Sequence, residues 1–186
     1  MSNIKKGFEE NNFKIVEKII YENKVGIVAE HNEVTNYKTG KFKKAYYLEG
    51  TPYQMGRLLG SLAEEEINSV TSKFLYSIIK SYLCYIDNNR KWVFNKIPRF
   101  IWDWVTNYVI KETSKLIETS PDHIIDELKG IVDGCMEKNT ETTVSLEKLM
   151  AVNYGFDYLQ SQVYNPDGNL LRSYIPGYGR FSDIFN

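Results

Sequence analysis

The chain has 186 residues and a mass of 21.7 kDa, which is enough for one domain with a hydrophobic core but short for two. Hydrophobic residues make up 42% of it and charged residues 25%, a balance that is typical of a globular protein and argues against a disordered one. The net charge of −1 removes the electrostatic basis of a nucleic-acid binder, whose affinity depends on neutralising phosphates, so we expect no nucleic-acid partner.

Residues 1–50 favour β-strands. Three runs rich in β-branched or aromatic residues, Phe13–Tyr21, Val25–Glu30 and Lys44–Glu49, are separated by turn-forming residues. They predict a small antiparallel sheet or the edge of a larger one. The spacing of apolar residues in Phe13–Tyr21 also fits a helix.

A helix start follows the strands. Thr51 and Gln54 form a Thr-x-x-Gln capping box, and Pro52 suits the first helical position. This helix should include Val70 and could extend to about Ile86, where polar residues stop it. The three consecutive acids that begin at Glu64 indicate a solvated helix face.

Three further helices are expected. One covers Pro98 to about Glu118, one begins at a second cap-plus-proline signal at Ser120–Asp122, and one runs from Leu146 to roughly Gln160. The whole of 51–160 is therefore expected to be helical.

The last segment, 161–186, is expected to be an aromatic loop. From Asn165 to Asn186 it has no helical period and at most one short strand around Leu170–Tyr174, and it is aromatic rather than polar. A long aromatic loop of this kind is normally functional or packed against something. We expect the chain to form one domain segment over 1–186, with no internal repeat.

Two pairs of glycines four residues apart lie inside predicted helices: Gly56 with Gly60, and Gly130 with Gly134. Each interior glycine costs on the order of 1 kcal/mol relative to alanine, so close approach of another backbone is the usual compensation. We expect the two helices to cross tightly at these glycines. A ligand-facing role is the alternative, but neither pair has the spacing of a phosphate-binding loop.

The chain holds two cysteines, Cys84 and Cys135, and two histidines, His31 and His123. This inventory gives no disulfide framework and a poor metal site, so we expect no metal. A free cysteine is commonly a small buried hydrophobe. A catalytic thiol would need one of the histidines as its base, and His123, in the first turn of its helix, is expected at the surface.

Aromatic residues gather in the middle of the chain. They comprise Trp92, Trp102, Trp104, Phe94, Phe100 and Tyr108. A core or partner-facing helix is the preferred interpretation, and a membrane-surface patch with the nearby Lys91, Lys96 and Arg99 is the alternative.

Stable membrane anchoring is not expected. The N-terminus has no apolar signal region, and charges interrupt the two most apolar stretches, Phe74–Ile86 and Ile97–Ile110. These features predict a cytoplasmic protein.

Two blocks carry a family resemblance. The first is Tyr46–Ile67, and the second is Ile125–Gly134, followed after a spacer by Leu146–Tyr154. In this order they resemble the N-terminal region of phospholipase-B-like and penicillin acyltransferase-like (acyl-CoA:6-aminopenicillanate acyltransferase) N-terminal-nucleophile hydrolases. The family's Gly-x-Pro-Tyr-x-x-Gly-x-x-x-Gly helix corresponds to Gly50–Gly60, and its Glu-Leu-x-Gly-Ile-x-x-Gly helix to Glu127–Gly134. The blocks cover about a third of the chain.

The resemblance implies an α+β fold of the αββα sandwich type, mostly helical in this chain, with a few N-terminal strands and completed by a second chain. Such precursors cut themselves before a cysteine, whose new α-amine then serves as the base for its own thiol. The resemblance thus implies a heterodimer of this α chain with a β chain from the same precursor. Asn186 would be the processing junction, and no catalytic residue would lie in this chain.

The implied activity is hydrolysis or transfer of an acyl group on a small-molecule amide, without a cofactor. Four residues are expected to line the acyl pocket: Tyr154, Tyr158, Tyr178 and Arg180. Core packing is the equal alternative for the first two, and a higher homo-oligomer is compatible with the resemblance. Two rival interpretations remain, namely a non-enzymatic helical binding module that acts through its aromatic cluster and a self-contained thiol enzyme that uses Cys84 or Cys135.

Overall fold

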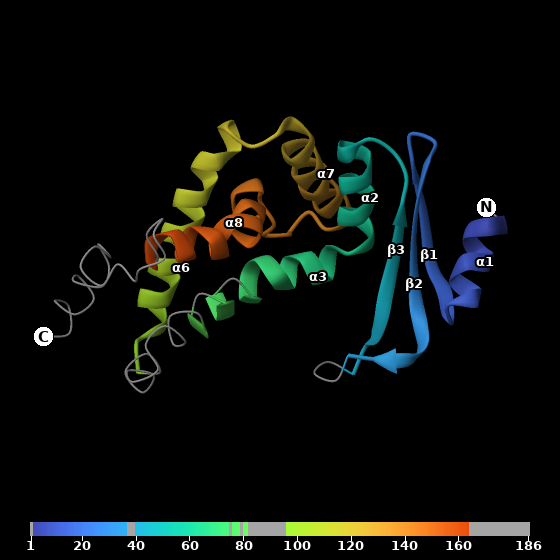
Figure 1. The fold of residues 1–186 in the computed structure, drawn as a ribbon, viewed down its shortest axis with the longest axis horizontal. Coiled ribbons are helices and arrows are strands. Elements are labelled where there is room, and N and C mark those ends of the chain that lie inside the picture. Colours follow the sequence, from blue (N-terminus) through green and yellow to red (C-terminus); the bar gives the residue numbers. More distant parts are fainter. Residues whose placement is uncertain (1, 37–39, 75, 79, 82–95, 164–186) are drawn as a thin grey trace, which may run out of the picture. The chain divides into compact units, whose positions relative to one another are not determined.

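The computed structural model describes residues 2–36, 40–74, 76–78, 80–81 and 96–163 (Figure 1). The described residues divide into two compact units. The first lies within Met1–Ser69 and Ser120–Leu146, and the second within Val70–Thr119 and Glu147–Asn186. The predicted α+β class and mostly helical content are confirmed.

The first unit contains a three-stranded antiparallel sheet in the order β1-β2-β3. Its strands are β1 (Phe13–Tyr21), β2 (Lys24–Thr35) and β3 (Phe42–Leu48), so the predicted strands and their antiparallel pairing are confirmed. The strand β2 extends five residues beyond the predicted end at Glu30. A β-bulge interrupts the pairing of β1 with β2 between Ile15 and Glu17.

The sheet has two different faces. Gly26 lies on the face that packs against α2 (Pro52–Leu62), because a Cβ atom built on Gly26 would lie 3.1 Å from both Leu58 and Leu62. We call this the α2 face. Since successive residues of a strand point to opposite faces, Ile27 and its register partner Tyr47 lie on the other side.

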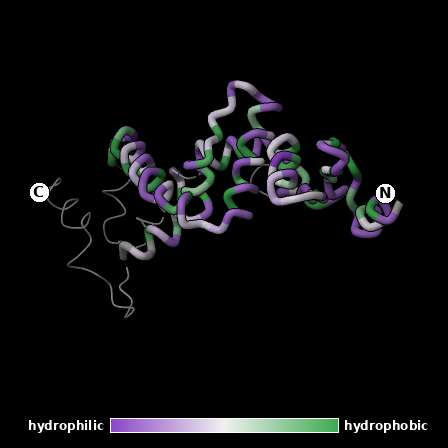
Figure 2. The backbone as a smooth tube through the Cα atoms, turned by 90° about the horizontal axis from the view of Figure 1, so that it is seen from above, coloured by the Kyte–Doolittle hydropathy of each residue, from purple (hydrophilic) through white to green (hydrophobic). Residues whose placement is uncertain are grey.

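That other side, the α1 face, carries an N-terminal helix that the sequence interpretation missed, α1 (Ser2–Glu10). Two apolar residues one turn apart, Ile4 and Phe8, line a groove against the sheet. Ion pairs between lysines and glutamates four residues apart lie on its exposed side. Figure 2 shows hydrophobic and hydrophilic residues alternating along this helix.

The predicted capping box at the start of α2 is confirmed. Thr51 Oγ1 accepts a hydrogen bond from the Gln54 backbone N–H at 3.3 Å, and Gln54 Oε1 accepts one from the Thr51 N–H at 3.0 Å. The expectation of one continuous helix from here to Val70 is wrong. Ala63, at φ −124° and ψ 22°, leaves the helical conformation and ends α2.

Two short helical segments follow this break, α3 (Glu64–Ser69) and the π-helical turn η1 (Val70–Phe74). The break coincides with burial of Glu64, which is 7% exposed and accepts a hydrogen bond from Asn139 Nδ2 at 3.2 Å. The prediction that the three acids form a solvated face is therefore wrong for Glu64. The predicted helix end at Ile86 lies outside the described residues.

The remaining helices are α6 (Arg99–Ser114) with its 3₁₀ extension η3 (Lys115–Glu118), α7 (Asp122–Lys138) and α8 (Leu146–Val163). All three α-helices were predicted, with starts that differ by at most two residues. The Ser120 cap is wrong, because Pro121 occupies the N-cap position of α7 and no side chain caps that end.

The predicted glycine crossing is confirmed. A Cβ atom built on any of the four glycines would lie 2.0–2.3 Å from a backbone oxygen of the opposite helix, a separation that real Cβ atoms do not show. Gly56 and Gly60 meet α7, while Gly130 and Gly134 meet α2. Figure 1 shows α7, α2, the sheet and α1 as successive layers of the first unit. The crossing thus holds α7 against α2, the helix that covers the α2 face of the sheet.

No helix in the described part of the chain is long and apolar enough to cross a bilayer.

Candidate functional site

The two predicted pocket residues that the structure describes, Tyr154 and Tyr158, both lie on α8 in the second unit. Both are half-buried. Tyr158 packs against the buried cluster of Val105, Val109 and Ala151, as the core-packing alternative expects. Its hydroxyl group still reaches the surface of the unit.

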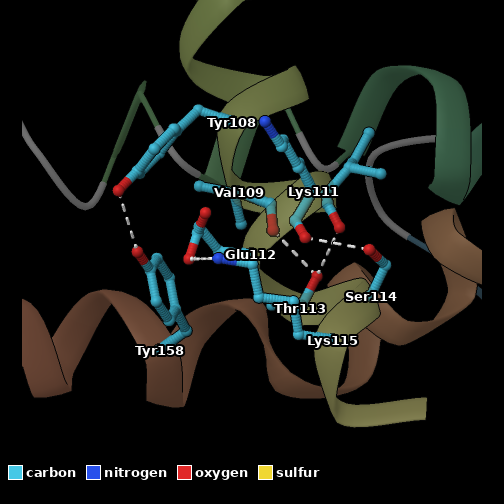
Figure 3. Close-up of polar contacts among 9 residues, drawn as sticks. Tyr108, Val109, Lys111, Glu112, Thr113, Ser114, Lys115 and Tyr158 are labelled. Carbon is cyan, nitrogen blue, oxygen red and sulfur yellow. Dashed lines mark hydrogen bonds and ion pairs between the residues drawn. The ribbon is translucent and has the colours of Figure 1, made fainter. Parts of the chain in front are cut away.

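Tyr158 joins a row of rings that links α8 to α6. The Tyr158 hydroxyl donates a hydrogen bond to the Tyr108 hydroxyl at 3.4 Å, close to the upper limit for such a bond (Figure 3). The Tyr108 ring stacks on Trp104 with 6.1 Å between centroids and 20° between planes. Burial, and then the hydrogen bond with Tyr108, raises the pKa of Tyr158, so this hydroxyl stays protonated at neutral pH.

The predicted aromatic cluster is split between core and surface. Trp102 is 2% exposed, whereas Phe100, Trp104 and Tyr108 are 69%, 62% and 46% exposed. These three exposed rings recur every fourth residue along α6, so they form one stripe on the side away from the buried Trp102 and Val109. We call this stripe the aromatic ridge. The aromatic ridge is therefore the exposed apolar feature of α6 that a binding role would use.

Several predicted residues lie outside the described part of the chain. They are Tyr178, Arg180, Asn186, Cys84, Trp92, Phe94 and Lys91.

A polar cluster that the sequence interpretation missed surrounds Arg57 in the first unit. Arg57 Nη1 donates to the Tyr53 hydroxyl at 3.3 Å, and Arg57 Nη2 lies 3.0 Å from Glu137 Oε2. The Tyr53 hydroxyl donates to Asp133 Oδ2 at 2.7 Å, and the guanidinium lies 4.4 Å from the centroid of the Tyr21 ring. We call these five residues the Arg57 cluster.

The electrostatics of the Arg57 cluster favour a protonated Tyr53 hydroxyl and a charged Arg57. The hydrogen bond to Asp133, followed by burial, raises the pKa of Tyr53, so its hydroxyl remains a donor. Although burial opposes the charge on Arg57, the hydrogen bond to Tyr53 and the carboxylate of Glu137 leave its pKa above the ordinary value. Arg57 Nε is buried without a hydrogen-bond partner among the described residues.

The cluster links β1, α2 and α7 beside the glycine crossing. Its charged groups already engage one another, so its chemical capacity is to hold these elements rather than to attack a substrate. A sequence signal for it exists. Tyr53 with Arg57, and Asp133 with Glu137, are polar pairs four residues apart that flank the glycine pairs on the same two helices.

Cys135 lies inside the crossing and is 0% exposed. Its thiol donates a hydrogen bond to the Gly60 carbonyl oxygen at 3.5 Å. Burial, followed by the charge of Glu64, raises the pKa of Cys135 to about 12. Because the thiolate is the nucleophilic form, this cysteine is a packing residue, as expected for a buried free thiol.

Neither histidine acts as a base for the Cys135 thiol. His31 Nδ1 accepts hydrogen bonds from the Glu33 and Val34 backbone N–H groups at 3.1 and 2.9 Å, so it holds the end of β2. His123 is exposed in the first turn of α7, as predicted. Within the described residues, no three histidine, cysteine or acidic side chains gather closely enough to hold a metal ion.

Comparisons with known proteins add one relative. No family model matches the chain, and no solved structure matches it. A protein of Archaeoglobus fulgidus, described as uncharacterized, is 29% identical over 125 residues, which are 67% of this chain and 18% of the archaeal protein. The chain therefore spans less than a fifth of the length of this relative.

Proposed function

We propose that this chain is the α part of a self-processed cysteine N-terminal-nucleophile hydrolase that hydrolyses or transfers an acyl group on an amide. The nucleophilic cysteine and its α-amine are supplied by a polypeptide segment outside this chain, and the protein acts as a heterodimer without a cofactor. The observation that carries the proposal is the crossing of α2 and α7. The two motifs that resemble the family, Gly50–Gly60 and Glu127–Gly134, are the two sides of one backbone contact.

The layer order of the first unit also supports this proposal. An αββα sandwich needs a sheet with helices on one face and apolar residues on the other. Here α2 covers one face and α7 packs on the outside of α2, while the other face carries Ile27, Ala29 and Tyr47 and has α1 over part of it (Figure 1). Ile20, which pairs with Val25 on the same side, is 63% exposed, so part of this face is open for a second sheet.

The properties of Cys135 support a nucleophile from elsewhere. A thiol with a pKa of about 12 that is fully buried cannot supply an acyl-accepting thiolate at neutral pH. The length of the archaeal relative fits a function that needs more polypeptide than this chain.

A chemical trapping experiment tests the proposal. The natural gene product is incubated with a p-nitrophenyl acyl ester, quenched in acid and digested, and the acylated cysteine is located by mass spectrometry. We expect the acyl group on the N-terminal cysteine of a second fragment, with release of p-nitrophenol. Acylation of Cys135, or no acylation of any cysteine, would contradict the proposal.

The aromatic ridge favours a second candidate, a helical binding module without catalysis. Phe100 and Trp104 are more than 60% exposed on α6, which is uncommon for such large apolar side chains. A module of this kind would give no acylated cysteine in the same experiment, and replacing Trp104 would abolish its binding to a partner.

A further inference from the structure

We propose that the outer edge of β3 is a strand-addition site, where an extended segment of the partner chain continues the sheet. The site would also seat apolar side chains of that segment in a groove beneath α1. This inference rests on the proposed function only for the source of the segment.

Among the residues that the structure describes, the backbone of β3 presents a hydrogen-bonding row that no strand pairs with. The Glu49 N–H donates to the Val25 carbonyl oxygen at 3.0 Å, which identifies residues 25 and 49 as a hydrogen-bonded pair. In an antiparallel ladder such pairs alternate, so Ala45 and Tyr47 bond to β2. The backbone groups of Lys44, Tyr46 and Leu48 therefore point away from β2.

Within the described residues, β3 is a terminal strand and no other strand lies beside this row. The pairing of β3 with β2 is regular from Lys44 to Leu48. An unpaired and regular strand edge is a template for one kind of occupant, an extended backbone that supplies the matching donors and acceptors.

The opposite edge of the sheet is protected against the same event. The bulge between Ile15 and Glu17 breaks the regular backbone row of β1. The regular backbone row of β3 is therefore the better template for an added strand.

A groove beside β3 specifies the side chains of the added segment. It has a volume of about 380 Å³ and is lined by Ala45 and Tyr47 of β3 together with Ile4, Gly7 and Phe8 of α1 and two further residues. Because Ala45 and Tyr47 lie on the α1 face, residues opposite them on an added strand would face the same side. We expect two apolar residues there, two positions apart.

The charge at the end of the site adds a further requirement. Lys43 is exposed and shares the α1 face with Ala45 and Tyr47, whereas Lys44 is turned to the α2 face, where it pairs with Glu66. An acidic residue of the added segment would lie opposite Lys43. The partner segment is thus an extended run of alternating apolar residues with an acid at one end.

Hydrogen exchange of the natural gene product tests the site. The readout is the exchange rate of the outward amides of Tyr46 and Leu48 relative to the inward amides of Ala45 and Tyr47. If a strand is added, all four rates agree within about tenfold, whereas a free edge leaves the outward amides at least about 100-fold faster. The second result would overturn the proposal.

A matched pair of variants separates backbone from side chain. Tyr46→Pro removes the ring together with an outward N–H, and proline is tolerated on a free edge, whereas Tyr46→Ala removes the ring and keeps the N–H. We expect the proline variant to lose at least about 90% of the bound partner chain, because the loss of one backbone N–H and the disturbance of its neighbours weaken binding about tenfold. The alanine variant should retain the partner chain. Equal retention in both variants would overturn the site.

The outcome is separable from that of the proposed function. Protected outward amides in a gene product without an N-terminal cysteine fragment would leave the strand-addition site standing and remove the enzyme. Unprotected outward amides in a processed two-chain enzyme would remove the strand-addition site and leave the proposed enzyme standing.

Discussion

The Cα atom of Gly56 faces the backbone oxygen of Glu127 so closely that a Cβ atom on Gly56 would lie 2.0 Å from that oxygen. The neighbouring atoms are backbone, which cannot move aside as the end of a flexible side chain can. Two helices of the first unit are therefore held together at a separation that only glycine allows.

Replacing Gly56 by alanine should destabilise the protein in spite of the better helix propensity of alanine. The propensity gain is about 1 kcal/mol, but the clash forces the helices apart, and we expect a net loss of about 2–4 kcal/mol. The measurement is urea-induced unfolding of the natural gene product.

Gly7→Ala is the matched control for this substitution. Gly7 is also inside a helix, but its added Cβ atom would meet nothing within 4 Å. This variant should be as stable as the natural protein or more stable by about 0.5–1 kcal/mol. Equal stability of the Gly56 and Gly7 variants would show that the crossing is looser than described.

Two tryptophans two residues apart should differ sharply in their effect on stability. Trp102→Ala removes a ring that is 2% exposed and should cost about 3–5 kcal/mol. Trp104→Ala removes a ring that is 62% exposed and should change the free energy of unfolding by less than about 0.5 kcal/mol. Thermal melts of the two variants check this, and a large loss in the Trp104 variant would mean that the aromatic ridge is part of a core.

The Cys135 thiol should resist alkylation in the folded protein. With its pKa raised to about 12, the thiolate fraction at pH 8 is on the order of one in ten thousand, against about a quarter for an ordinary thiol. Iodoacetamide should label the peptide that contains Cys135 only after unfolding in urea, as peptide mass mapping would detect. Rapid labelling in the native state would contradict the assigned packing role.

The Tyr53 hydroxyl should make stability depend on alkaline pH. Its pKa is raised above the ordinary value of 10.0, so the native state keeps this proton longer than the unfolded state does. The stabilisation is complete below pH 10 and falls as the pH rises through the folded pKa. Tyr53→Phe should be less stable by about 1 kcal/mol at pH 8.

The same variant should lose less stability than the natural protein between pH 9 and about pH 11. Chemical denaturation at several pH values measures the difference. Parallel pH profiles of the two proteins would mean that the hydrogen bond to Asp133 does not raise the pKa of Tyr53.

Local sequence rules predicted most of the fold because its signals are local. The Thr51–Gln54 capping box, the β-branched runs and the glycine spacings each act within a few residues, and each appears in the structure. The helix α1 was missed because nine residues give only two apolar positions on one face. The break at Ala63 was missed because the burial of Glu64 against Asn139, 75 residues away, has no local signal.

The candidate sites were harder to predict for the same reason. Whether an aromatic residue of α6 enters the core depends on which side of the helix meets α8, so Trp102 and Trp104 could not be separated by composition. The Arg57 cluster joins β1, α2 and α7 and exists only after the crossing has formed. The four-residue spacing of its polar pairs was visible in the sequence, but the contacts between the two helices and the strand were not.

The most direct test of the central claim is the intact mass of the natural gene product under denaturing conditions, combined with N-terminal sequencing. Self-processing predicts two species, one of which begins with cysteine. A single species with no fragment that begins with cysteine would remove the N-terminal nucleophile and contradict the proposed enzyme.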